Sequence, residues 1–272
     1  MSVRTDLALE QWKSHPESSL SGVSCSEYLL SPFRVTEIRI TDSRGEALLG
    51  KPAGHYLTAE SENDPDIFLC AAALSSLLRP LLPADGPVLI CGLGNRDMTP
   101  DALGPKALES LIVTRHLIEA MPEVFGGMRP VCAVAPGVLG NTGVETAEFI
   151  LGIVQRISPK AVVAVDALAA REYNRLCRTF QISDTGIIPG SGACNPRKAL
   201  NFQTLGVPVI AVGVPTVVAA RALGDETLPE DLLVAPKDID SRIARCGRIL
   251  GYALDLALQG EMTAGEIEDY LQ

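Results

Sequence analysis

The stretch VLICGLG at residues 88–94 is an apolar run that ends in glycines, and it decides the fold class. Three further runs share its character: VCAVAPG at 131–137, AVVAVDA at 161–167 and VPVIAVGVP at 207–215. Apolar residues at consecutive positions are typical of strands in a parallel sheet whose two faces are covered by helices. Helical stretches are expected between the runs, from about Pro100 to Ala120 and from about Gly143 to Arg156. This alternation predicts a doubly wound, mostly parallel α/β sheet flanked by helices.

The segments around these runs predict extra edge strands and two more helices. VTEIRITDSRG at 35–45 and GKPAGHYLTAE at 50–60 have the pattern of extended segments with turns. TFQISD at 179–184 follows the preceding run too closely for a crossover helix, which favours antiparallel pairing there. A buried helix is expected between Pro65 and Leu82, and a long amphipathic helix from Pro236 onward. No linker or repeat interrupts the pattern, so we expect a single domain over residues 1–272.

Composition excludes several classes of protein. The chain has 33 acidic and 23 basic side chains, a formal net charge of −10, which disfavours direct binding to nucleic acid. No apolar run reaches the roughly 20 residues that cross a bilayer, and the N-terminus lacks an apolar signal core. The seven cysteines include no CxxC pair, which indicates reduced thiols in an intracellular protein. We therefore expect a cytoplasmic protein without a membrane partner.

Two aspartates follow strands at the edge where an open α/β sheet binds its ligands. Asp166 ends an apolar run, where a buried carboxylate needs a hydrogen-bond donor, a cation, a metal or a proton. Its alternative role is to cap a helix. Asp101 lies in the loop after residues 88–94, and Thr99 and Pro100 before it are also typical of an ordinary helix start.

Familiar motifs do not explain these residues. GLGN at 92–95 lacks the third glycine of a dinucleotide fingerprint, since Asp97 stands in its place. The chain also contains no GxSxG, HExxH or GxxxxGK[ST].

A series of motifs resembles the germination proteases of spore-forming bacteria. They occur in order along the chain: VRTDLA at 3–8, EIRITD at 37–42, GLGN and TPDALGP within 92–105, VTRH at 113–116, APGVLGNTGVET at 135–146, VDALAAR at 165–171, QISDTGIIPGSG at 181–192, GVPVIAVGVPTVV at 206–218 and APKDID at 235–240. The resemblance implies an aspartic-type endopeptidase that starts the degradation of small acid-soluble spore proteins during germination. It also implies a fold similar to the hydrogenase-maturation endopeptidases, a homotetramer and a location in the spore core.

The family's two aspartates fall on Asp101 and Asp166, which the strand-end argument selects independently. Two converging carboxylates are expected to share a proton, one activating water and the other polarising the scissile carbonyl. Backbone N–H groups around Gly94, Gly190 and Gly192 are candidates to bind the substrate carbonyl. We expect no cofactor and no metal; the alternative is a metal held by the same carboxylates, as in the hydrogenase-maturation relatives.

The N-terminus contains a match to the family's own cleavage preference, an acidic residue followed by a bulky apolar residue and alanine. Asp6-Leu7-Ala8 has this form, so residues 1–6 are expected to be a short propeptide that the enzyme removes itself, as a zymogen does. The alternative is a helix cap at Thr5 or Asp6. Arg171 is the expected partner of the acidic substrate side chain.

Two competing functions remain at this point. One is a nickel-dependent peptidase of the hydrogenase-maturation type, which shares the fold class. The other is a catalytically silent spore protein on the same scaffold, which the presence of both aspartates disfavours.

Overall fold

The computed structural model describes residues 5–15, 21–190, 197–224, 227–229, 231–260 and 262–271. Its centre is a group of four parallel strands in the order β8-β6-β4-β5. Their bounds are β4 (Val88–Gly92), β5 (Val131–Val134), β6 (Ala161–Ala170) and β8 (Val209–Ala219). These are the four apolar runs of the sequence, so the predicted α/β class with a parallel core is confirmed.

Antiparallel strands extend this core into a sheet of nine strands within the described residues. They are β1 (Val23–Leu30), β2 (Phe33–Ile40), β3 (Gly54–Glu60), β7 (Thr179–Ser183) and β9 (Leu233–Val234). β7 pairs antiparallel with both β8 and β3, as expected from the short connection before it. β1 and β2 form a hairpin outside β3, so the antiparallel part is larger than the sequence patterns indicate.

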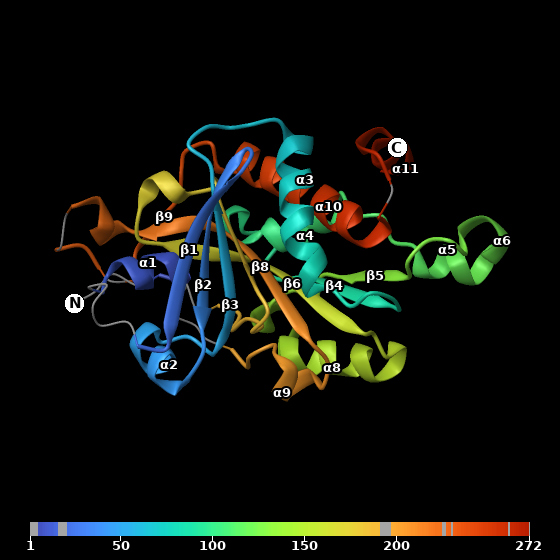
Figure 1. Ribbon diagram of the computed structural model, residues 1–272, viewed down its shortest axis with the longest axis horizontal. Coiled ribbons are helices and arrows are strands. Elements are labelled where there is room, and N and C mark those ends of the chain that lie inside the picture. The colour runs from blue at the N-terminus through green and yellow to red at the C-terminus, as the bar shows by residue number, and fades with distance from the viewer. Residues whose placement is uncertain are drawn as a thin grey trace.

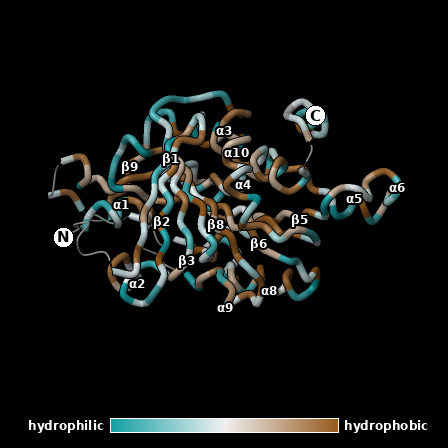
Figure 2. The backbone as a smooth tube through the Cα atoms, viewed as in Figure 1, coloured by the Kyte–Doolittle hydropathy of each residue, from teal (hydrophilic) through white to brown (hydrophobic). Residues whose placement is uncertain are grey.

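Helices cover the two faces of the sheet (Figure 1). On one face lie α3 (Ile67–Leu78), α4 (Leu103–Leu108) and α10 (Ile239–Gln259), and on the other lie α8 (Thr146–Ile157) and α9 (Phe202–Leu205). Asp66 caps α3 by accepting from two backbone N–H groups, and α10 buries Cys246, Ile249, Leu250 and Ala253 at helical spacing. The central strands between these layers are coloured largely as hydrophobic in Figure 2.

The single helical stretch expected from about Pro100 to Ala120 is divided in the structure. A 3₁₀ turn, η3 (Thr99–Asp101), precedes α4, and α5 (Arg115–Ala120) begins only after an extended segment. That segment is bonded to distant groups: Ile112 N–H donates to Asp255, and the Thr114 hydroxyl donates to the Arg129 carbonyl. These tertiary contacts override the local helical pattern.

The remaining elements are short helices at the periphery and the C-terminal helix. They are α1 (Ala8–Lys13), α2 (Ser43–Leu49), α6 (Pro122–Phe125), α7 (Leu139–Thr142), α11 (Ala264–Leu271), and the 3₁₀ turns η2 (Arg79–Leu81), η4 (Tyr173–Arg175) and η5 (Ala220–Leu223). None of the helices in the described ranges has the length and apolarity to cross a membrane.

Candidate active site

Asp166 lies inside β6, four residues before the strand ends, and its side chain is buried. It caps no helix; one carboxylate oxygen accepts from the Ala167 N–H at 2.9 Å. Burial raises the pKa of Asp166 well above its usual value, and the nearby charges of Asp101 and Asp6 raise it further. The hydrogen bond from the Ala167 N–H lowers this pKa and so opposes the rise. This environment favours the protonated form of the Asp166 carboxyl group over the ionised form.

Asp101 reaches the same region from the loop after β4. The Leu93 N–H donates to the Val165 carbonyl at 2.8 Å, which holds this loop beside β6. The Asp101 carboxylate accepts the Asn95 N–H at 2.7 Å and so closes the loop on itself. Burial raises the pKa of Asp101, and the Asn95 hydrogen bond opposes this rise. Two carboxyl groups therefore meet at this edge, with Asp166 the more strongly protonated.

Gly94 makes the close packing of this loop possible. Its φ of +103° is left-handed, and a Cβ there would lie 2.0 Å from the Asp101 carbonyl oxygen. Any other residue would displace the turn that contains Asp101.

The N-terminal segment lies over the sheet next to this pair. Asp6 N–H donates to the Ala169 carbonyl at 3.0 Å, and Ala169 N–H donates to the Asp6 carboxylate at 2.9 Å. Leu7 is fully buried in an apolar cluster with Leu168, Ala170, Leu176 and Val218. The sequence Asp6-Leu7 is thus bound like a short peptide against β6.

Lys51 and Gln181 complete this arrangement, and sequence reasoning missed both. Lys51 Nζ donates to the Asp6 carbonyl oxygen at 2.8 Å, and Gln181 Nε2 donates to it at 3.1 Å. They lie with Asp6 on the wall of a cavity of about 380 Å³. Lys51 is in a turn without any motif; Gln181 offered only a weak signal, a polar residue between Phe180 and Ile182 in a buried strand.

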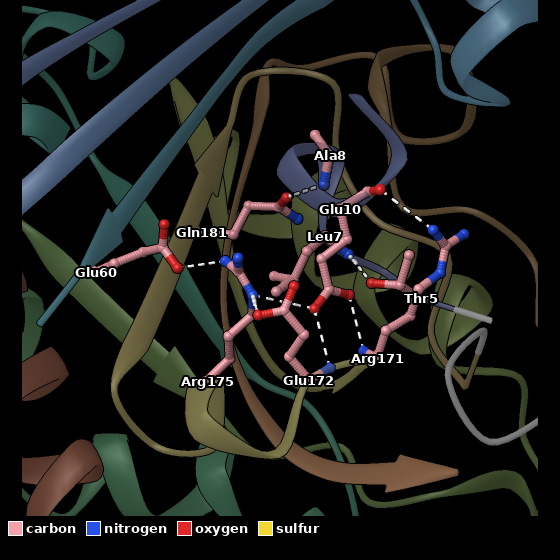
Figure 3. A network of polar contacts seen from close by, with 9 residues as sticks. All are labelled: Thr5, Leu7, Ala8, Glu10, Glu60, Arg171, Glu172, Arg175 and Gln181. Carbon is pink, nitrogen blue, oxygen red and sulfur yellow. Dashed lines mark hydrogen bonds and ion pairs between the residues drawn. The ribbon is translucent and has the colours of Figure 1, made fainter. Parts of the chain in front are cut away.

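Downstream of Leu7, an ion-pair network fixes the chain (Figure 3). The buried Glu10 carboxylate accepts the backbone N–H groups of Arg171 and Glu172, at 2.8 and 3.2 Å. Arg175, also buried, pairs with Glu10 at 3.1 Å and with Glu60. These contacts anchor α1 to the end of β6.

The expected substrate-binding residues are placed as follows. The Arg171 guanidinium donates to the Glu10 carbonyl and to Gln11, both at 3.2 Å, on the downstream side of Leu7. Gly190 has a left-handed φ of +71° in the turn after β7, and Gly192 lies outside the described residues. Within the described residues, no three His, Cys, Asp or Glu side chains are placed to hold a metal ion.

Comparison with known proteins identifies the family. The sequence profile of the germination protease family matches residues 3–230. The chain belongs to this family. Curated germination proteases are similar to it over most of their length: that of Caldanaerobacter subterraneus is 39% identical, covering 100% of this chain and 98% of its own, and that of Clostridium tetani is 38% identical, covering 100% of both. The germination protease of Priestia megaterium is 44% identical over 84% of this chain and 66% of its own.

Membership of the germination protease family makes the chain a peptidase, as the motifs indicated. A search of solved structures finds a [NiFe] hydrogenase maturation protease, HycI from Thermococcus kodakarensis, at 18% identity and a TM-score of 0.37. It covers 66% of this chain and 99% of the other.

Proposed function

We propose that this peptidase is an aspartic-type endopeptidase that starts the degradation of small acid-soluble spore proteins, cutting after an acidic residue and before a bulky apolar one. The observation that carries this proposal is the placement of Asp6-Leu7-Ala8. Its acidic carboxylate and backbone are held by Ala169, and its leucine is buried in an apolar cluster. The segment lies close enough to Asp166 for the charge of Asp6 to raise the pKa of that residue.

The unequal environments of the two carboxyl groups assign their roles. Asp101 accepts a backbone hydrogen bond and is the better candidate for the ionised form, whereas deeply buried Asp166 keeps its proton. Asp101 takes a proton from water as the water oxygen attacks the scissile carbonyl carbon. Asp166 gives its proton to the peptide group, so that the C–N bond breaks and a neutral amine leaves.

The same geometry supports self-processing at Asp6–Leu7. A zymogen that carries its own cleavage sequence beside the catalytic pair would remove residues 1–6 in a single intramolecular step. Arg171 and the backbone around Gly94, Gly190 and Gly192 remain proposed substrate contacts. In the structure Arg171 binds the carbonyl of Glu10, four residues after the acidic position.

The proposed setting is the cytoplasm of the spore core, with the enzyme acting as a tetramer, as the family resemblance implies. The net charge of −10 fits a protease that removes the protein coat of DNA without binding DNA itself.

Digestion of a purified small acid-soluble spore protein tests the proposal. The wild-type chain should cut after acidic residues, as mass mapping of the products would show, and its own mature N-terminus should be Leu7. Asp166→Asn should abolish both cleavages. The matched control is Asp255→Asn, which alters another buried carboxyl group and should retain them. Full activity of Asp166→Asn would refute the catalytic assignment, and an active preparation that still begins at Met1 or Ser2 would refute self-processing.

A further inference from the structure

Two side chains that the two-aspartate mechanism leaves unused converge on one backbone atom. The Asp6 carbonyl oxygen, which belongs to the Asp6–Leu7 peptide bond, accepts from Lys51 Nζ at 2.8 Å and from Gln181 Nε2 at 3.1 Å. Lys51 comes from the turn between α2 and β3, and Gln181 comes from β7. Both distances lie in the range of donors that stabilise the oxyanion of acyl transfer.

Gln181 binds the main chain on both sides of Leu7. Its Oε1 accepts the Ala8 N–H at 2.7 Å, while its Nε2 donates to the Asp6 carbonyl (the amide and Ala8 are labelled in Figure 3). The Ala8 donor fixes the orientation of the amide, because only the oxygen can accept from it. Gln181 is therefore a donor to the carbonyl, and it recognises backbone rather than side chain.

The sheet places Gln181 in the same row as Asp166, one member of the catalytic pair. Gly213 of β8 pairs with Asp166 on one side and with Gln181 on the other, so the three residues form one row across the sheet. Two strand spacings put Asp166 and Gln181 roughly 10 Å apart at the backbone. Residues in one row of a sheet project their side chains to the same face, so Asp166 and Gln181 share the face on which a peptide group can contact both.

Lys51 is a costly residue to use for a structural hydrogen bond. A buried carbonyl needs one donor, which an uncharged group supplies, whereas an ammonium loses hydration when it is buried. Burial lowers the pKa of Lys51, and the charge of Asp6 partly offsets this. The nearby Tyr56 ring, 5.8 Å from Nζ, adds a cation–π contact. A partly buried ammonium that lines the cavity is suited to an oxygen that becomes negative during the reaction.

We propose that Lys51 and Gln181 are catalytic residues that hold the scissile carbonyl oxygen and stabilise its negative charge, with Lys51 also facing the acidic side chain before the cut. This inference rests on the proposed function, since it treats Asp6–Leu7 as a substrate. The protons balance as follows: Asp101 accepts one water proton, Lys51 holds the oxyanion without giving up a proton, and Asp166 protonates the leaving nitrogen. The new carboxylic acid then returns its proton to Asp166, and Asp101 gives its proton to the released amine, which restores the starting state.

The test compares full-length wild type with Lys51→Met, Lys51→Arg and Gln181→Glu. Gln181→Glu keeps the acceptor for Ala8 and removes the donor to Asp6. Two rates are measured: self-cleavage at Asp6–Leu7 followed by mass spectrometry, and kcat and KM on a peptide containing Thr-Asp-Leu-Ala-Leu-Glu. The control is Lys198→Met, which removes an exposed lysine paired with Glu148. Thermal unfolding of each variant reports folding separately.

We expect Lys51→Met and Gln181→Glu each to lower kcat by about 10²–10³-fold with little change in KM, as removal of one oxyanion donor does. Self-cleavage should slow in parallel, Lys51→Arg should recover part of the rate, and Lys198→Met should match wild type. Unchanged kcat in folded Lys51→Met and Gln181→Glu, or a rise in KM alone, overturns the inference. If Asp166→Asn, assayed alongside these variants, is inactive while they keep their kcat, the proposed function still stands. A wild-type chain that cuts neither substrate overturns both.

Discussion

Asp166 and Asp255 are both buried, but different groups surround their carboxylates. Asp255 lies in α10 and accepts the Ile112 N–H at 3.0 Å, and its second oxygen is buried without a hydrogen-bond partner. Burial raises the pKa of Asp255 to about 8. Asp166 is likewise buried with a raised pKa, but the charges of Asp101 and Asp6 act on it as well.

The difference shows that burial protonates a carboxyl group without making it catalytic. Burial raises the pKa of both groups, yet of the two only Asp166 lies near a second carboxyl group and the Asp6-Leu7 segment. Perturbed pKa values mark functional sites only when a reaction partner is within reach. Asp255 ties the extended segment before α5 to α10, which is a structural role.

The largest effect is expected from the catalytic pair. Asp101→Asn and Asp166→Asn should each lower kcat for spore-protein cleavage by about 10³-fold or more, because each removes one half of a proton relay. The double variant should be little worse than either single one, since residues acting as a unit are not additive. Steady-state kinetics of the three variants measure this. If the losses in kcat of the two single variants multiply in the double variant, Asp101 and Asp166 contribute independently and do not act as a pair.

Asp255 should instead govern the pH dependence of stability. Its pKa is about 8 in the folded protein, above the usual value of 3.8, so the folded state binds the proton more tightly. Its stabilising contribution is complete below about pH 4 and is lost as the pH rises to about 8, a change on the order of 5 kcal/mol. Asp255→Asn should flatten this slope and raise the free energy of unfolding at pH 8, while leaving cleavage intact.

Urea unfolding of wild type and Asp255→Asn from pH 5 to pH 9 provides the measurement. Glu148→Gln, which changes an exposed carboxylate, is the control and should leave the slope unchanged. Parallel slopes in wild type and Asp255→Asn would mean that Asp255 is ionised in the folded state at neutral pH.

The sequence predicts the parallel core well because its signal is local. Each of the four runs is apolar at consecutive positions, and Asp101 follows the loop after the first run, whereas β6 continues for four residues beyond Asp166. The same reasoning places Asp101 and Asp166 in one region, because neighbouring parallel strands end at the same edge. The antiparallel partner β1 was not predicted, since its exposed outer face gives VSCSEYLL no clear alternation.

The contacts around Asp6 lie beyond such reasoning. Lys51 and Gln181 are 45 and 175 residues away from it along the chain. Nothing in a single sequence indicates that a turn lysine and a strand glutamine share one carbonyl oxygen. The division of the helical stretch after Pro100 has the same origin, because Asp255 and Arg129 supply its competing hydrogen bonds from far along the chain.

The smallest effect is expected from Asp97→Asn. This substitution tests whether Asp101 acts through its position or only through the negative charge of its loop. Asp97 lies in the same loop, is exposed, and donates its own N–H to the Asn95 side chain at 3.1 Å. Because its carboxylate is in water and bonded to none of the catalytic groups, Asp97→Asn should change kcat by less than about twofold, the range of ordinary surface substitutions. Steady-state cleavage at low and high salt measures this. If the rate falls with Asp97→Asn as it does with Asp101→Asn, and salt reproduces the fall, then the loop acts through its total negative charge and Asp101 has no unique role. A normal rate in Asp97→Asn beside an inactive Asp101→Asn would instead show that cleavage requires the Asp101 carboxylate, which accepts the Asn95 N–H.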